Sequence, residues 1–134
     1  MIDIDASKML KEANLRPTKQ RVSLVATIYK YGNRHLSAES LHKEILDTGD
    51  NVSLATVYNT LHHLTNLGFL RQVKINARQN YFDTNITDHH HFFDKSNNSL
   101  IDISKDLIKI QGIPIPPKNK IVSDIELIIS IKNK

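Results

Sequence analysis

Three consecutive histidines, His89, His90 and His91, are the residues of this chain best suited to chemistry. Aspartates stand on both sides of them, Asp83 before the run and Asp102 after it. Imidazole nitrogens and carboxylate oxygens together suit Fe(II), Mn(II) or Zn(II). If the run is a strand, His89 and His91 point to one face while His90 points away. The segment therefore predicts a metal site, and a run of three histidines is also compatible with haem.

The chain contains no cysteine, so any transition metal must be bound by nitrogen and oxygen atoms. Disulfides, structural zinc held by four cysteines and thiolate-ligated haem are all excluded. The acidic N-terminus has no signal-peptide pattern, and no apolar run approaches the ~20 residues that a membrane helix requires. We therefore expect a cytoplasmic protein with no membrane partner.

Positive charge is concentrated near the N-terminus. The formal net charge of the 134 residues is +4. Between Lys8 and Arg34 the sequence has seven lysines and arginines against one acid, Glu12. Clustering of this kind is typical of a surface that binds a polyanion, although net charge alone does not establish such a partner.

The first part of the chain has the pattern of a winged helix. Helices are expected over residues 4–13, from the N-cap Thr18 to about Lys30, after the N-cap Ser37, and from Ser53 to a stop at Gly68. Leu41, Ile45 and Leu46 should face inward on the third helix; Leu54, Val57, Leu61 and Leu64 should do so on the fourth. Residues 37–40 fall short of a capping box, since Ser40 stands where Glu is usual. Residues 70–75 and 80–83 then predict a β-hairpin.

The remaining residues change character and predict a second, sheet-forming lobe. Short strands are expected at residues 91–93 and 100–103, and a long one at residues 121–131. Pro114, Pro116 and Pro117 prevent a helix between them. The predicted fold class is α+β, with a winged helix-turn-helix DNA-binding domain at residues 1–83 and a second domain at residues 84–134.

The helix that begins at Ser53 has the features of a base-recognition helix. Its face opposite the apolar stripe has no charge and carries small or amide side chains, as a helix in the major groove requires. Asn59 is suited to adenine, Ala55 or Thr56 to a thymine methyl group, and Tyr58 to a base or phosphate. The expected DNA-binding residues are Arg16, Lys19, Arg21, Ser53, Ala55, Thr56, Tyr58 and Asn59, with the basic ones holding phosphates and Arg16 alternatively entering the minor groove.

Three strings resemble the ferric uptake regulator (Fur) superfamily. They are Leu-Arg-Pro-Thr-Lys-Gln-Arg at residues 15–21, His-Leu-Ser-Ala-Glu at 35–39 and Ser-Leu-Ala-Thr-Val-Tyr-Asn-Thr-Leu at 53–61. The resemblance covers about residues 10–132. It implies a homodimeric, metal-responsive transcription factor that binds double-stranded operator DNA, with an N-terminal winged helix and a C-terminal α/β dimerisation domain. Residues 81–93 and the ending without cysteines resemble the iron response regulator branch most, with the peroxide regulator branch as the nearest rival.

The resemblance also implies a set of ligands for a divalent metal. Matched motif by motif, they are His35, Asp83, His89, His91 and Asp102. In such a site, a metal that joins both lobes would fix the angle between them, and so the spacing of two recognition helices in a dimer. For the iron response branch, the resemblance adds haem as a signal, with His89, His90 and His91 as its tentative contacts. His42, His62 and His63 are expected at the surface or facing DNA.

Four hypotheses remain open on the sequence alone. The first is a regulator of iron and haem homeostasis that binds AT-rich operator DNA. The second is a peroxide sensor whose Fe(II) site oxidises a ligand histidine, and the third is a small metallohydrolase, which would need an open coordination position and a placed base. The fourth is a metal-independent winged-helix repressor.

Overall fold

The computed structural model describes residues 5–134, which separate into two compact units divided between Ile86 and Thr87. The chain runs through helices and strands in an α+β order, as the sequence predicts. Within the described residues, no helix is long and apolar enough to cross a membrane.

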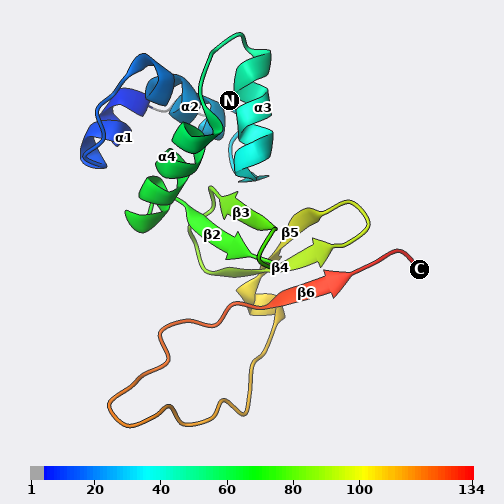
Figure 1. The fold of residues 1–134 in the computed structure, drawn as a ribbon. Helices are drawn as coiled ribbons and strands as arrows, with labels where there is room; N and C mark the ends of the chain where they lie inside the picture. Colours follow the sequence, from blue (N-terminus) through cyan, green and yellow to red (C-terminus); the bar gives the residue numbers. More distant parts are fainter. Residues whose placement is uncertain (1–4) are drawn as a thin grey trace. The chain divides into compact units, whose positions relative to one another are not determined.

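Unit 1 contains four helices (Figure 1), whose bounds are α1 Ala6–Glu12, α2 Lys19–Tyr29, α3 Ala38–Asp47 and α4 Leu54–Asn66. Side-chain caps fix where they begin. Thr18 Oγ1 accepts a hydrogen bond from the Arg21 N–H, and Ser53 Oγ accepts one from the Thr56 N–H. Such caps satisfy amide groups that a helix start leaves without a partner. Three of the four predicted starts therefore coincide with observed caps, the third being Ser37.

The start of α3 corrects one prediction. Ser37 and Ser40 form a reciprocal capping box, in which each side chain accepts a hydrogen bond from the backbone N–H of the other, both at 3.1 Å. The Ser40 hydroxyl therefore performs the task usually given to a Glu side chain. The expectation that residues 37–40 lack this motif was wrong.

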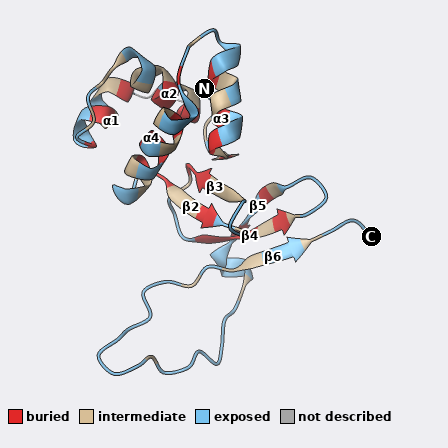
Figure 2. Cartoon of the chain, in the orientation of Figure 1, coloured by how far each residue is buried: buried red, intermediate tan, exposed pale blue. Residues whose placement is uncertain are grey.

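Apolar residues of all four helices form one core in unit 1 (Figure 2). Leu41, Ile45, Val57, Leu61 and Leu64 are fully buried in it, as their spacing predicts. Two predicted core residues are instead partly exposed: Leu46 is 46% exposed and Leu54 37%. Both lie at the margins of their helices' apolar faces, where Ala38 and Thr60 are buried in their place.

A small antiparallel sheet completes unit 1. Strands β2 (Arg71–Lys74) and β3 (Asn80–Asp83) form the predicted hairpin, and β1 (His35–Leu36) pairs with the other edge of β3. The order is therefore β1-β3-β2. The sequence did not predict β1, because two residues are too short to show an alternating pattern. Helices followed by this hairpin make unit 1 a winged helix.

Unit 2 is built on the sheet order β5-β4-β6. Strands β4 (His89–Asp94) and β5 (Ser99–Ser104) form an antiparallel hairpin, and β6 (Ile128–Ile131) lies parallel to β4. A short 3₁₀ helix, η1 (Lys105–Leu107), follows β5. Residues 108–127 then form a long excursion without helix or strand, largely exposed (Figures 1 and 2). The predicted strand over residues 121–131 is thus wrong for its first seven residues, since β6 begins only at Ile128.

Candidate metal centre and DNA-binding surface

Unit 1 holds a buried histidine–aspartate pair. The β1–β3 register sets His35 opposite Asp83, and their side chains meet with His35 Nε2 3.1 Å from Asp83 Oδ2. Asp83 is fully buried, and its Oδ1 accepts a hydrogen bond from the Asn85 N–H at 2.9 Å. An ionised carboxylate costs much free energy to bury unless a cation or hydrogen bonds compensate it. A divalent cation would supply such compensation.

The residues beyond this pair hold it in register. Arg34 and Thr84 are joined by two hydrogen bonds at the end of the ladder: the Thr84 N–H donates to the Arg34 carbonyl, and the Arg34 N–H donates to the Thr84 side-chain Oγ1. The Arg34 guanidinium also makes a two-pronged ion pair with Glu44 of α3. His35 is therefore fixed from both the strand and the following helix.

Unit 2 brings together three further predicted ligands. The β4–β5 register sets His91 opposite Asp102, with His89 two residues away on the same face. Asp102 Oδ1 lies 3.2 Å from His89 Nε2 and 3.3 Å from His91 Nε2. The metal-ligating atoms of these three residues lie within 4.8 Å of one another. This donor set of two imidazoles and a carboxylate matches the preferences of Fe(II), Mn(II) and Zn(II).

The orientation of the rings favours metal binding through Nε2. His89 Nδ1 is 2.6 Å from the Thr87 carbonyl oxygen, which accepts hydrogen bonds only, so the proton of a neutral ring sits on Nδ1. Nε2 is then left with its lone pair towards Asp102. His89 and His91 are 6% and 2% exposed, whereas the Asp102 side chain is 41% exposed. The group is thus largely enclosed and open to solvent on the aspartate side.

His90 points away from this group, as the alternation of a strand predicts. Its ring is nevertheless 5% exposed, and its Nδ1 accepts a hydrogen bond from the Leu127 N–H at 3.0 Å. The side chain therefore has a structural partner in the segment that leads into β6.

The predicted DNA-binding residues all lie in unit 1, at the starts of α2 and α4 and along α4. Arg16, Lys19, Ala55 and Asn59 are exposed. Arg21 is only partly exposed, because its Nη1 donates to the Arg16 carbonyl at 3.1 Å.

Three predicted contacts on α4 are already engaged within the protein. Ser53 Oγ donates to Thr56 Oγ1 at 2.9 Å in addition to its capping bond. The Tyr58 hydroxyl donates to Glu39 Oε1 at 2.8 Å, and this hydrogen bond is the main cause that raises the pKa of Tyr58. Ala55 and Asn59 are therefore the side chains most available for base contacts. Glu39, which the sequence did not single out, belongs to the His35–Glu39 string and orients Tyr58.

Comparison with known proteins identifies the family of this chain. The model of the ferric uptake regulator family matches residues 12–129. This chain belongs to the ferric uptake regulator family. Its members are metal-responsive transcription regulators and not enzymes, which excludes the metallohydrolase hypothesis.

Individual members of the family are related over most of their length. The ferric uptake regulation protein of Shigella flexneri is 30% identical over 118 residues, which cover 87% of this chain and 80% of that protein. The structure of the Vibrio cholerae ferric uptake regulator matches with a TM-score of 0.75 at 23% identity, covering 96% of this chain and 100% of the other. That of the Pseudomonas aeruginosa ferric uptake regulator with manganese matches with a TM-score of 0.71 at 21% identity, covering 98% and 99%. These structural matches confirm the predicted fold.

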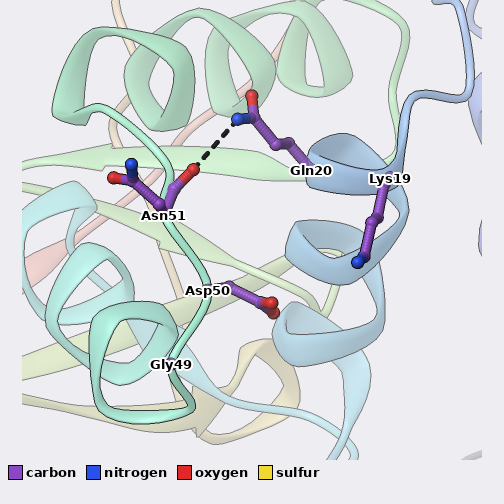
Figure 3. Close-up of a pocket in the computed structure, with 5 residues that line it drawn as sticks. All are labelled: Lys19, Gln20, Gly49, Asp50 and Asn51. Carbon is purple, nitrogen blue, oxygen red and sulfur yellow. Dashed lines mark hydrogen bonds between the residues drawn. The ribbon is translucent and has the colours of Figure 1, made fainter.

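A polar pocket of about 260 Å³ lies in unit 1 of this Fur-family chain, between the start of α2 and the loop before α4 (Figure 3). Lys19, Gln20, Gly49, Asp50 and Asn51 line it. Gln20 Nε2 donates to the Asn51 carbonyl at 2.9 Å, and the Ser23 hydroxyl of α2 donates to Asp50. These bonds connect the basic start of α2 to the loop that leads into α4.

Two other histidines correct the expectation that they lie at the surface or face DNA. His42 Nε2 is 2.8 Å from the Val52 carbonyl, and His63 Nε2 is 2.7 Å from the Ala13 carbonyl. Each connects a helix to a loop distant in sequence, so both have structural roles in this Fur-family domain. His62 is exposed and stacks on Tyr58, as expected for a residue at the edge of the recognition face.

Proposed function

We propose that this chain regulates iron homeostasis genes by binding operator DNA when a divalent metal is held by His35, Asp83, His89, His91 and Asp102. The observation that carries the proposal is that each unit contains a preformed part of the ligand set. In support of it, the β1–β3 register sets His35 beside Asp83 in unit 1, and the β4–β5 register sets the other three proposed ligands close together in unit 2. A single ion bound by both parts would hold residues 1–83, as DNA-binding domain, against residues 84–134, as dimerisation domain.

Iron(II) is the metal that we propose for this site in the cell, with Mn(II) and Zn(II) as ions that it also accepts. Three imidazoles and two carboxylates suit all three ions, and availability in the cell decides which is bound more than affinity does. The bound ion supplies positive charge that offsets the buried Asp83 carboxylate. Through His35 and Asp83 the winged helix would be attached to the ion, and through His89, His91 and Asp102 the second unit would be attached to the same ion.

The proposed DNA contacts follow from exposure and residue type. Ala55 and Asn59 of α4 would face base edges, and Arg16 and Lys19 would hold phosphates of an AT-rich duplex. Two such helices are presented when the chain forms a homodimer, and the metal sets their spacing. A ligand shifts this equilibrium only if it binds one arrangement better than the other.

The decisive experiment measures metal and DNA binding together. The metal-free protein is titrated anaerobically with Fe(II) and with Mn(II), and DNA binding is followed with duplexes selected from a random-sequence library. We expect one tightly bound ion per chain and metal-dependent DNA binding. His35→Ala in one unit and His89→Ala in the other should each weaken binding of that same ion.

The matched control is His62→Ala, which removes an exposed histidine outside the ligand set. Its metal affinity should equal that of the wild type. Two independent ions per chain, or an ion whose affinity responds to His89→Ala but not to His35→Ala, would contradict a shared site. DNA binding that ignores both chelator and His35→Ala would instead favour the metal-independent repressor.

Two finer alternatives are tested on the same samples. In the peroxide-sensing alternative, hydrogen peroxide added to the Fe(II) protein should add oxygen mass to His35 or His91, and an unchanged mass spectrum rejects it. The haem alternative uses His89, His90 and His91, and gains little support because His90 Nδ1 accepts a hydrogen bond from the Leu127 N–H, which puts the proton of the neutral ring on Nε2, the nitrogen left to bind iron. A haem absorption band that is lost in the His90→Ala variant would restore it.

A further inference from the structure

Residues Glu126 and Leu127, just before β6, contact two histidines of the run. The His91 N–H donates to the Leu127 carbonyl at 3.1 Å, and the Leu127 N–H donates to His90 Nδ1 at 3.0 Å. Glu126 Oε1 lies 3.5 Å from His91 Nδ1. The segment therefore reaches both faces of β4 at the point where the proposed ligands lie.

The chemistry of a neutral imidazole gives the Glu126 contact its meaning. One ring nitrogen carries a proton and the other carries the lone pair that binds a metal. In His91 it is Nε2 that faces Asp102, at 3.3 Å, so an ion bound there together with Asp102 would take the Nε2 lone pair and leave the proton on Nδ1. The ring is 2% exposed, which puts water out of reach as the usual acceptor.

Metal-binding histidines almost always donate their second ring N–H to a carboxylate or carbonyl oxygen, which fixes the ring and increases its basicity. His89 has such an acceptor in the Thr87 carbonyl. Glu126 occupies the corresponding place beside His91, with a side chain that is 27% exposed. Its carboxylate lies on the Nδ1 side of the ring, away from the Nε2 atoms of the ligand group.

We propose that Glu126 is a positioning residue of the metal centre. This inference rests on the proposed metal site. When an ion binds Nε2 of His91, Glu126 accepts the Nδ1 proton in a hydrogen bond and keeps the ring aimed at the ion. Because Glu126 adjoins Leu127, the same contact draws β6 against β4, whose parallel register begins with His91 opposite Ile128. Metal binding therefore strengthens the attachment of the last strand.

The first test is the affinity for Zn(II), measured by competition with a chromophoric chelator. Glu126→Ala should weaken binding about 10- to 100-fold, the usual effect of losing such a partner. Glu126→Gln should weaken it less, because the amide oxygen still accepts the Nδ1 proton without a negative charge. Asp106→Asn, which removes an exposed carboxylate elsewhere in unit 2, is the control for charge and should bind like the wild type.

The second test follows backbone hydrogen exchange of residues 127–131. Saturating Zn(II) should slow exchange there in the wild type, and much less in Glu126→Ala. The Glu126→Gln variant, which changes the side chain least, guards against a general loss of folding. Equal affinity and equal protection in all three proteins would overturn the inference, provided that His89→Ala loses Zn(II). If His89→Ala keeps its affinity, the proposed metal site itself fails.

Discussion

Single residues of β4 acquire different roles from the face of the strand on which they lie. His89 and His91 share one face with Asp102, whereas His90 bonds the backbone of Leu127. The alternation of a strand predicts this separation from the sequence alone. It does not predict what His90 meets, because that partner is 37 residues away in the chain. Glu126 escaped prediction for the same reason.

A buried tyrosine gives a prediction for alkaline pH. Tyr29 donates to the Phe69 carbonyl, and burial raises its pKa to about 12 from the ordinary 10.0. The unfolded chain therefore loses this proton before the folded chain does. The neutral phenol's contribution to the free energy of unfolding is present in full below pH 10 and is lost as pH rises towards about 12.

In Tyr29→Phe, the free energy of unfolding should therefore fall less steeply between pH 10 and about 12 than in the wild type. The difference in slope against pH should correspond to at most one bound proton. Urea denaturation at closely spaced pH values measures it. Tyr31→Phe is the control, because it removes the hydroxyl of a tyrosine that is 68% exposed. Parallel curves for the wild type and Tyr29→Phe would contradict the assignment.

At the scale of elements, caps and apolar spacing allowed the four helices and two hairpins to be predicted with their ends close to the observed ones. Elements defined by a distant partner were not predicted as well. β1 exists only because His35 and Leu36 pair with β3. β6 begins at Ile128, opposite His91, and in this parallel register β4, which starts at His89, has no residue opposite those before Glu126. The isoleucines before Leu127 are residues that favour a strand, but no part of β4 lies opposite them to form hydrogen bonds.

The capping box of α3 predicts unequal costs for two similar substitutions. Ser37→Ala removes the oxygen that caps the helix and should lower the free energy of unfolding by about 1 kcal/mol. Ser40→Ala keeps that cap and loses the return bond to the Ser37 N–H, so its cost should be smaller. Chemical denaturation measures both, with Ser123→Ala, in the exposed excursion, as the control. A larger cost for Ser40→Ala would show that the box is not what stabilises this helix start.

At the scale of the molecule, the division into two units predicts how metal affects unfolding. The metal-free protein should unfold in two calorimetric transitions, one for each compact unit. An ion that binds ligands in both units should raise both transition temperatures and merge the two transitions into one. The added stability should be about 2.7 kcal/mol at a metal concentration 100 times the dissociation constant. His89→Ala should keep two separate transitions at the same Mn(II) concentration. A metal that raises only one transition in the wild type would contradict a shared ion.

The parallel pairing of β4 with β6 also sets an order of folding. The β4–β5 hairpin closes through residues 95–98, so the three proposed ligands of unit 2 meet early. β6 reaches the opposite edge of β4 only after η1 and the excursion of residues 108–127 have been closed into a loop. Closing a longer loop costs more entropy and delays contacts between distant residues. In a newly folding chain, His89, His91 and Asp102 should therefore come together before Glu126 reaches His91. The affinity for metal should be low at that stage and should increase once β6 has paired with β4.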